Sequence, residues 1–351
     1  MLVAFDFFCG AGGLTRGLLD SGIKVLAGFD KEASCEESYK TNNGDAKFIC
    51  TDICDITLGK LIKLNPDARN FRNVIFAGCA PCQPFSSHRR AKTFTRDATL
   101  LLQFGRLVKA ARPGWVLIEN VPGMAKIKGF SAFRRFLATL ASCDYEVDYG
   151  VLDAKQFGVP QTRRRLVLLA SRHVPVTLPK PKFGPVLRPY RTVRQAITHF
   201  PQLPAGGACD EIPNHVASVI TQLNLERLAA TPIDGGTRAA WPAHLHLKCH
   251  SGGYAGHTDV YGRMAWDEPS PTLTGKCNSI SNGRYGHPTQ HRAISLREAA
   301  AIQSFPDGYQ FFGSMGEVAT QIGNAVPVKL AHELGKHIIG LAAHQQGRIP
   351  T

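Results

Sequence analysis

The sequence predicts an α/β fold with two domains, a larger one built on a parallel sheet and a smaller one rich in loops. Short apolar runs alternate with amphipathic stretches over the first 170 residues, which is typical of β-α units. The composition then changes: seven prolines fall within residues 175–204, and residues 206–290 are rich in Gly, His, Asn, Thr and Pro without periodicity. The expected larger domain covers residues 1–175 and 315–351, and the expected smaller domain covers residues 176–314.

Six apolar runs predict the strands of the sheet, and in chain order they are Leu2–Phe8, Ile23–Phe29, Phe48–Cys50, Val74–Ala77, Trp115–Ile118 and Leu166–Ala170. The glycines after the first run open a helical stretch that Gly22 closes. Apolar residues at three- and four-residue spacing predict further helices, over Thr99–Ala111, Phe130–Leu140, Ser295–Ser304 and Val328–Leu341.

The charge of the chain favours a polyanionic partner. It has 351 residues, a mass of 38.2 kDa, a net charge of +14 and a pI near 9.5, so nucleic acid is the first candidate. No apolar run approaches the roughly 20 residues of a membrane span, and the first residues lack the basic leader of a signal peptide. We therefore expect a cytoplasmic protein with no membrane association.

The ten cysteines are scattered along the chain. Without a secretory signal, reduced thiols are more consistent with this pattern than a disulfide framework. The pairs Cys79/Cys82 and Cys50/Cys54 resemble halves of metal sites, but neither has a second pair at zinc-ribbon spacing. We expect no bound metal.

Three groups at the ends of the first strands fit a nucleoside ligand. Glycines 10, 12 and 13 follow the first strand and open a helix, an arrangement that lets a ligand approach the backbone. Asp30 ends the second strand, where a carboxylate can bind ribose hydroxyls, and Asp52 follows the third strand, where it can accept from an adenine amino group. These features alone fit a dinucleotide, S-adenosylmethionine or tight packing.

A second set of polar residues lies beside later strand ends. Cys82 follows the fourth strand and is a candidate nucleophile if cations or backbone dipoles favour its thiolate. Glu119 follows the fifth strand, and alternation places Arg163 and Arg165 on one face before the sixth. A thiol, a carboxylate and two guanidiniums could surround one planar heterocycle. The basic segment 86–96 suits a loop that closes over phosphates.

These motifs closely resemble those of the DNA (cytosine-5) methyltransferases, of the small bacterial and phage restriction-modification type. The matching blocks are FCGAGG at 8–13, APCQPFS at 80–86, ENV at 119–121, QTRRR at 161–165, RAISLRE at 292–298 and GNAVP at 323–327. The resemblance covers nearly the whole chain in the family's order. It implies a Rossmann-like S-adenosylmethionine-dependent methyltransferase domain and a smaller, loop-rich target-recognition domain.

The resemblance implies methyl transfer from S-adenosyl-L-methionine to carbon 5 of a flipped-out cytosine in duplex DNA, with S-adenosyl-L-homocysteine as the product. Cys82 would add to carbon 6 of the base. Glu119, protonated when it acts, would engage ring nitrogen 3 and the exocyclic amine. Arg165 would contact the base carbonyl, and Arg163 would support the adduct.

The resemblance also assigns binding residues. The expected cofactor-binding residues are Phe8, Gly10, Gly12, Gly13, Asp30, Asp52, Ile53, Leu100 and Asn324. The expected DNA-binding residues are Ser86, Ser87, Arg89, Arg90, Thr272, Asn278 and Arg284. Arg188, Arg191 and Arg194 are expected to touch phosphates or to be solvated. Pro81 and Gln83 would shape the cysteine loop. The family often shows Asp-x-Arg before the leucine at position 100, whereas this chain has Arg96-Asp97, so the anchoring of the loop differs.

Several alternatives stay open. A zinc site could use Cys249 and His250 with His257 or Cys277, although base reading or loop packing is the simpler interpretation. Methylation of transfer RNA is disfavoured because the CysPheThr segment of that branch is absent, and a non-catalytic DNA-binding homologue because Cys82 and the glycines are present. A nicotinamide oxidoreductase has no use for Cys82, Glu119 and the arginines together. We expect a monomer that acts beside a cognate restriction endonuclease, in a bacterium or, if phage-encoded, in its host.

Overall fold

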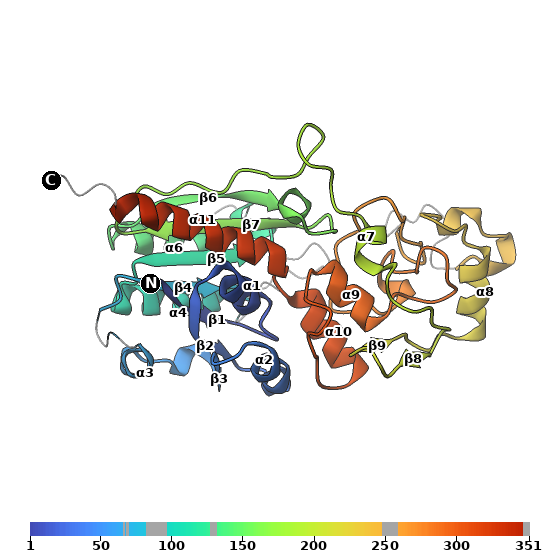
Figure 1. The fold of residues 1–351 in the computed structure, drawn as a ribbon, viewed down its shortest axis with the longest axis horizontal. Helices are drawn as coiled ribbons and strands as arrows, with labels where there is room; N and C mark the ends of the chain where they lie inside the picture. Colours follow the sequence, from blue (N-terminus) through green and yellow to red (C-terminus); the bar gives the residue numbers. More distant parts are fainter. Residues whose placement is uncertain (66, 68–69, 82–96, 127–131, 248–258, 347–351) are drawn as a thin grey trace. The chain divides into compact units, whose positions relative to one another are not determined.

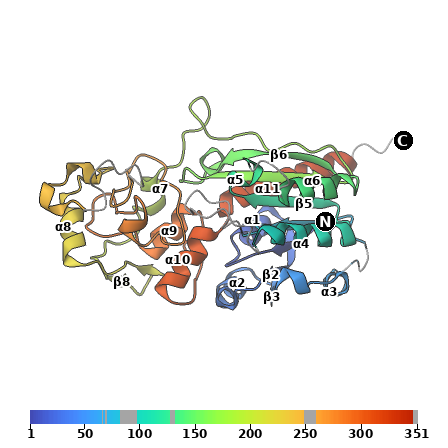
Figure 2. The same cartoon turned by 180° about the vertical axis from the view of Figure 1, so that it is seen from behind.

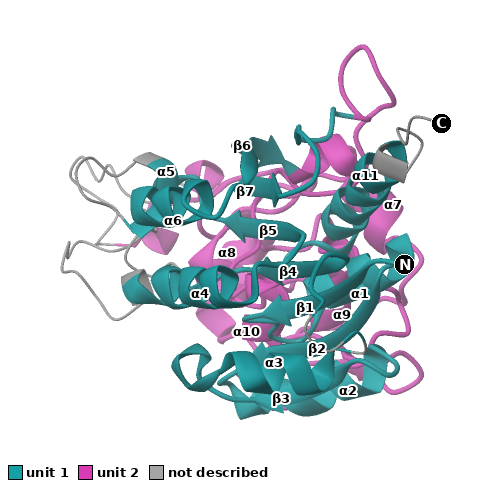
Figure 3. Ribbon diagram, turned by 90° about the vertical axis from the view of Figure 1, so that its left-hand side faces the viewer, with its two compact units in different colours: residues 1–153, 164–181, 326–351 teal, residues 154–163, 182–325 magenta. Residues whose placement is uncertain are grey.

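The computed structural model describes residues 1–65, 67, 70–81, 97–126, 132–247 and 259–346. The chain forms two compact units, coloured separately in Figure 3. Unit 1 comprises residues 1–153, 164–181 and 326–351, and unit 2 comprises residues 154–163 and 182–325. The expected boundaries at 175 and 315 differ from these, because the segment 154–163 and the helix that precedes residue 326 group with unit 2. Among the described residues, no helix is long and apolar enough to cross a membrane.

A seven-stranded sheet forms the centre of unit 1, with the strand order β3-β2-β1-β4-β5-β7-β6 (Figure 1). The strands are β1 Val3–Phe7, β2 Lys24–Asp30, β3 Lys47–Cys50, β4 Val74–Gly78, β5 Trp115–Asn120, β6 Glu146–Asp153 and β7 Arg164–Ser171. The first five are parallel, whereas β7 runs antiparallel to both of its neighbours. The predicted parallel sheet is therefore mixed at this edge. Strand β6 was not predicted because much of it is exposed and it lacks an apolar run.

Seven α-helices accompany this sheet in the described part of unit 1: α1 Gly13–Ser21, α2 Glu36–Asn42, α3 Leu58–Leu64, α4 Asp97–Ala111, α5 Gly123–Lys126, α6 Ala132–Ala141 and α11 Val328–Gln346. Alternation along β1 divides its residues between the two faces. Phe5 and Phe7 join a core with Phe104 of α4 and Phe136 of α6. Helices α4 and α6 lie in front in Figure 2. Asp6 has the opposite parity and meets Thr15 of α1.

Helix α1 crosses α11 closely at Gly17. A Cβ atom at this glycine would lie 2.4 Å from the Cβ atom of Ala331 and 2.5 Å from the carbonyl oxygen of Val328. Only a residue without a side chain allows this approach. The C-terminal helix is thereby fixed against the first helix of the unit.

Unit 2 contains little regular structure. Its helices are α7 Val193–Ile197, α8 Gln222–Ala230, α9 Leu296–Ile302 and α10 Met315–Asn324, and its strands β8 Ala208–Cys209 and β9 His215–Val216 pair antiparallel. Short 3-10 turns complete it, over Ala154–Phe157, Arg238–Ala240, Ala243–Leu245 and Ile280–Asn282. The loop-rich character predicted for this region is observed.

Buried arginines hold the loops of unit 2 together. Arg263, Arg292 and Arg297 are fully buried. Arg263 donates to the backbone oxygens of Leu228, Thr231, His287 and Gln290. Arg292 instead forms a bidentate ion pair with Glu298, with both contacts at 2.7 Å. A guanidinium has five fixed donors, so each of these side chains satisfies several loop carbonyls or one whole carboxylate.

Candidate active site

The glycine loop after β1 turns sharply before α1. Phe8, Gly10 and Gly12 have φ angles of 62°, 51° and 92°, in the region that glycine adopts without strain. The amides of Phe8 and Cys9 both donate to the backbone oxygen of Phe29, so the loop is attached to the end of β2. A Cβ atom at Gly10 would meet nothing within 4 Å. The space beside the loop is therefore open to a ligand, as a nucleoside cofactor requires.

Asp30 ends β2 beside this loop. Its Oδ2 accepts a hydrogen bond of 2.7 Å from the Gly10 amide, and its Oδ1 accepts one of 3.0 Å from the Glu32 amide. Burial raises the pKa of the Asp30 carboxyl above its ordinary value, although these amide hydrogen bonds oppose the shift. The carboxylate is oriented by two backbone donors and keeps further acceptor positions for ribose hydroxyls.

The segment after β3 is held by a helix of the same unit. Asp52 caps the 3-10 turn Ile53–Asp55 by accepting from the amide of Cys54 at 2.9 Å. Ile53 and Leu100 are both buried. Arg106 of α4 donates to the carbonyl oxygens of Ile53 and Ile56, each at 3.0 Å. Sequence reasoning did not identify Arg106, because nothing in the sequence distinguishes it from the other basic residue of this helix, Lys109.

A buried polar network lies beneath the glycine loop and was also missed. The hydroxyl of Thr15 donates to Oδ2 of Asp6 at 2.7 Å and lies 3.0 Å from the hydroxyl of Tyr39. Burial raises the pKa of Asp6 to about 7, and the negative charge of Asp30 adds to this shift. Within the part of the chain that is described, Oδ1 of Asp6 is buried without a hydrogen-bond partner. An aspartate inside an apolar strand was the available signal.

Glu119 lies at the carboxyl end of β5 and is 2% exposed. The Sγ atom of Cys79 donates to its Oε2 at 2.9 Å. The Nε atom of Arg165, on β7, lies 3.0 Å from its Oε1 as an ion pair whose angles fall outside hydrogen-bond geometry. Cys79 follows β4, so the two strands that flank β5 supply the two neighbours of this carboxylate.

Asn120 attaches the chain that leads to Cys82. Its Nδ2 donates to the carbonyl oxygen of Ala80 at 3.0 Å, and its Oδ1 accepts from the amide of Val121. The described chain continues to Pro81. Segment 82–96 lies outside the described residues. It contains six of the predicted site residues: Cys82, Gln83, Ser86, Ser87, Arg89 and Arg90.

Arg163 lies in unit 2, although Arg165 lies in unit 1. Strand β7 begins at Arg164, so the predicted alternation does not extend to Arg163. Its guanidinium is buried and donates to the backbone oxygens of Leu273, Gly323 and Ala325, at 2.9, 3.1 and 3.2 Å. Arg163 therefore joins three segments of unit 2.

Thr272 belongs to the same junction. Its hydroxyl donates to the carbonyl oxygen of Thr162 at 2.7 Å, while the amide of Leu273 donates to the buried side chain of Gln161. Asn324 is exposed at the end of α10. The segments of these residues are far apart in the sequence and adjacent within unit 2.

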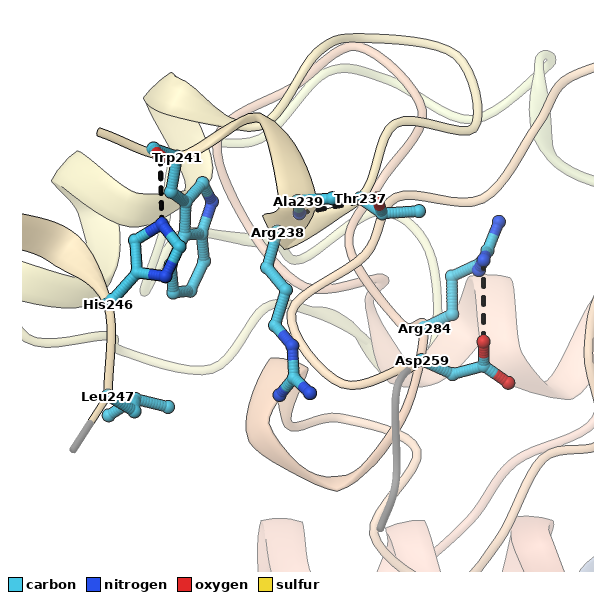
Figure 4. Close-up of a pocket in the computed structure, with 8 residues that line it drawn as sticks. All are labelled: Thr237, Arg238, Ala239, Trp241, His246, Leu247, Asp259 and Arg284. Carbon is cyan, nitrogen blue, oxygen red and sulfur yellow. Dashed lines mark hydrogen bonds and ion pairs between the residues drawn. The ribbon is translucent and has the colours of Figure 1, made fainter. Parts of the chain in front are cut away.

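A pocket of about 370 Å³ lies in the part of unit 2 that the sequence assigns to target recognition (Figure 4). It is lined by Thr237, Arg238, Ala239, Trp241, His246, Leu247, Asp259 and Arg284. Arg284 reaches Asp259 at 3.4 Å and the carbonyl oxygen of Gly235 at 3.3 Å, both long contacts. Outside this pocket, Asn278 donates to the hydroxyl of Ser218. Arg284, a predicted DNA-binding residue, therefore lies beside a cavity.

The residues of the alternative zinc site are only partly described. Cys249, His250 and His257 lie outside the described residues. Burial raises the pKa of the Cys277 thiol to about 12, and its Sγ lies 3.8 Å from the carbonyl oxygen of Ala319. Across residues 1–247 and 259–346, apart from their undescribed gaps, no group of three or more His, Cys, Asp or Glu side chains could hold a metal ion.

Comparisons with known proteins agree on one family. A family model described as C-5 cytosine-specific DNA methylase matches residues 2–340. The Type II methylase M.HgiDII of Herpetosiphon aurantiacus is 40% identical, with 98% of each chain covered. The Type II methyltransferase M1.HphI of Haemophilus parahaemolyticus is 30% identical, with 98% of this chain and 88% of the relative covered.

Solved structures show the same fold. A DNA modification methyltransferase encoded within an E. coli prophage has a TM-score of 0.74 at 21% identity, covering 98% of this chain and 100% of its own. The Dnmt2 methyltransferase of S. pombe has a TM-score of 0.65 at 17% identity, covering 97% and 99%.

Proposed function

The chain belongs to the C-5 cytosine-specific DNA methylase family, and on that premise we propose that it methylates one short sequence of duplex DNA through a covalent adduct with Cys82. The chain is a DNA (cytosine-5) methyltransferase with a Rossmann-like fold, and its cofactor is S-adenosyl-L-methionine. The observation that carries the proposal is the buried Glu119 carboxylate between Cys79 and Arg165, next to the segment that leads to Cys82.

The proposed chemistry begins with addition of the Cys82 thiolate to carbon 6 of a cytosine flipped out of the duplex. The electron pair of the carbon 5–carbon 6 double bond makes carbon 5 a nucleophile. When bound, S-adenosyl-L-methionine supplies the methyl group as an electrophile for this carbon. Loss of the carbon-5 proton restores the double bond and expels Cys82, which regenerates the free thiolate and releases 5-methylcytosine.

Glu119 and Arg165 would hold the base during this addition. Glu119 would contact ring nitrogen 3 and the exocyclic amine, and Arg165 would contact the base carbonyl, so that charge developing on the ring is offset. The 3.0 Å ion pair between these residues supports the assignment, because it already places the two side chains in contact across the neighbouring strands β5 and β7. Arg163 is engaged with backbone carbonyls, so we assign it an indirect role in supporting the adduct through the segments it holds.

The open glycine loop and the oriented Asp30 carboxylate fit the cofactor. Asp30 would accept from the ribose hydroxyls, Phe8 would face the adenine ring, and Asp52 with Ile53 would flank the base. Leu100 and Asn324 are also proposed as cofactor-binding residues. The cradle of Gly10, Gly12 and Gly13 lets the cofactor approach the backbone, since a side chain at Gly10 would enter the open space.

Unit 2 and the segment 86–96 are proposed to bind DNA. Ser86 and Ser87 would help fill the space left by the flipped base, while Arg89 and Arg90 would contact phosphates. Thr272, Asn278 and Arg284 are proposed contacts within unit 2. We propose that the enzyme acts as a monomer in the bacterial cytoplasm or, if phage-encoded, in that of the host, beside a cognate restriction endonuclease.

Bisulfite sequencing of plasmid DNA from expressing cells tests this function. The wild type should protect cytosines within one short motif, and Cys82→Ala should protect none. Cys209→Ala is the matched control, since it removes a half-buried thiol from unit 2 and should protect the same motif as the wild type. If a soluble, correctly folded wild type protects no DNA cytosine, the DNA proposal fails, and methylation of transfer RNA becomes the next reaction to assay.

A further inference from the structure

Cys79 contacts the proposed catalytic carboxylate directly. Its half-buried thiol lies 2.9 Å from Oε2 of Glu119, a residue that is almost fully buried. The thiol donates this hydrogen bond to the carboxyl oxygen. We propose that Cys79 is a positioning residue that fixes the orientation of the Glu119 carboxylate for the incoming cytosine. This inference rests on the proposed function, because the role of Glu119 does.

The strand order explains why two neighbours suffice to fix the carboxylate. Strand β5 lies between β4 and β7, and Glu119 stands near its end. Cys79, just beyond β4, approaches Oε2 from one side, while Arg165 of β7 approaches Oε1 from the other. With one contact at each oxygen, rotation of the carboxyl plane breaks at least one of them. Each oxygen keeps a second position for a hydrogen bond, which leaves the group able to meet the base.

The adjacent residues make the same attachment rigid. Asn120 follows Glu119 and donates to the carbonyl oxygen of Ala80, which follows Cys79. The end of β5 therefore holds the end of β4 at two successive positions, once through a side-chain thiol and once through a backbone carbonyl. Cys79 is only three residues before Cys82 in the sequence. Its contact thus links the carboxylate to the chain that carries the nucleophile.

Steady-state kinetics of Cys79→Ala and Cys79→Ser test the proposal. Hydrogen bonds to charged groups are worth enough that the alanine variant should lose roughly tenfold in kcat. The KM values for DNA and S-adenosyl-L-methionine should stay within about twofold, since neither binding site loses a contact. Cys79→Ser keeps a donor of similar size and should recover most of the lost rate. Cys209→Ala, which removes an equally half-buried thiol from unit 2, should match the wild type.

Rescue by the conservative variant separates positioning from mere structural support, because serine restores a donor to the Glu119 carboxyl group. A wild-type kcat in the alanine variant would overturn the proposal. Equal losses in the alanine and serine variants, accompanied by a lower melting temperature, would also overturn it, because the thiol would then only fill space.

A chemical readout is independent of methyl transfer. Alkylation of Cys79 by iodoacetamide, followed by peptide mass spectrometry, is compared in Cys82→Ser and in Cys82→Ser with Glu119→Gln. Removing the neighbouring negative charge favours the thiolate, so the double variant should react several-fold faster at Cys79. Equal alkylation rates would show that the contact is absent. If the contact is present but the wild type does not methylate DNA, the proposed function fails while the contact between the two side chains stands.

Discussion

The carboxylate of Asp30 and the backbone amide of Gly10 form a hydrogen bond of 2.7 Å between the ends of two adjacent strands. The bond does two things at once. It orients Oδ2 within the sheet edge, and it fixes the glycine loop in its turn before α1. The proposed ribose contact and the loop beneath the cofactor therefore depend on the same side chain.

Replacement of Asp30 by Ala should weaken S-adenosyl-L-methionine binding by at least about tenfold, since both the loop anchor and the proposed ribose acceptor are lost. Isothermal titration calorimetry measures the change. Asp20→Asn is the matched control, because Asp20 is an exposed carboxylate of the same unit that pairs with Arg16 on α1. Equal affinities for wild type and Asp30→Ala would contradict the assignment of this residue.

The buried Asp6 should make the stability of unit 1 depend on pH near neutrality. Its pKa is raised from 3.8 to about 7 in the folded chain, mainly by burial. The native state therefore holds the proton more tightly than the unfolded state, and the associated stability is present in full below about pH 4 and lost as the pH rises through 7. The loss amounts to roughly 4 kcal/mol.

Urea denaturation between pH 5 and 8 measures this dependence. Asp6→Asn keeps an acceptor for Thr15 but cannot titrate, so its free energy of unfolding should fall less steeply with pH than that of the wild type. Asp30 has a raised pKa as well and contributes in the same direction, which makes the difference between the two proteins the informative quantity. Identical slopes would show that Asp6 does not titrate in this range.

Arg163 and Arg165 should separate stability from catalysis. Arg163→Ala leaves three backbone oxygens of unit 2 without their donor, so the free energy of unfolding should fall by about 3 kcal/mol. Arg165→Ala should lower kcat by at least about a hundredfold, because the ion pair with Glu119 and the proposed contact with the base carbonyl are both lost. Arg163→Lys retains the positive charge but lacks the planar guanidinium. Its free energy of unfolding should lie between those of the wild type and Arg163→Ala.

Thermal unfolding and single-turnover methylation of the Arg163 and Arg165 variants supply the two measurements. If Arg163→Ala keeps the wild-type melting temperature while kcat falls, its guanidinium acts on the adduct directly and the indirect role is wrong. If Arg165→Ala loses only stability, the proposed contact with the base carbonyl is wrong.

Arg284 should determine one base of the recognition sequence. Its contacts with Asp259 and Gly235 are long, and its side chain lines the pocket beside Asp259 (Figure 4). A bidentate contact between arginine and guanine is worth about 1–3 kcal/mol of discrimination. Arg284→Ala should therefore relax methylation at one position of the motif. Bisulfite sequencing at genome scale reads the relaxed position directly.

Arg188→Ala is the matched control for this experiment. The side chain of Arg188 is exposed and was assigned to phosphates or solvent, so its loss should weaken DNA binding evenly across sequences and reduce the salt dependence of affinity. An unchanged motif in Arg284→Ala, together with the same even weakening, would place Arg284 on the backbone of the DNA as well.

Sequence patterns predicted the central elements of the fold well. Apolar runs located six strands of the sheet, and three- and four-residue spacing located α4, α6, α9 and α11. Strand β6 was missed because its exposed edge lacks an apolar run, and the direction of β7 could not be read from composition. Short helices of unit 2 such as α7 carry too few turns for a periodic pattern.

The candidate site was predicted in part. The spacing of Gly10 and Asp30 placed both at neighbouring strand ends, and the structure joins them. Cys79 was considered only as half of a metal pair, whereas its thiol contacts a carboxylate 40 residues away along the chain. Asp6 and Arg106 were missed because their partners come from other elements. The functional roles of all these residues stay predictions.

The sequence by itself identified the family and predicted its chemistry, because motifs of fixed residue types in a fixed order can be recognised without knowing what each residue contacts. Only the tertiary structure decided what each side chain contacts. Arg163 and Arg165 are two positions apart, yet one joins carbonyls about 110 and 160 residues away and the other pairs with Glu119. The physical reason is that hydrogen bonds and ion pairs act over a few ångströms, and packing alone brings such distant segments within that range.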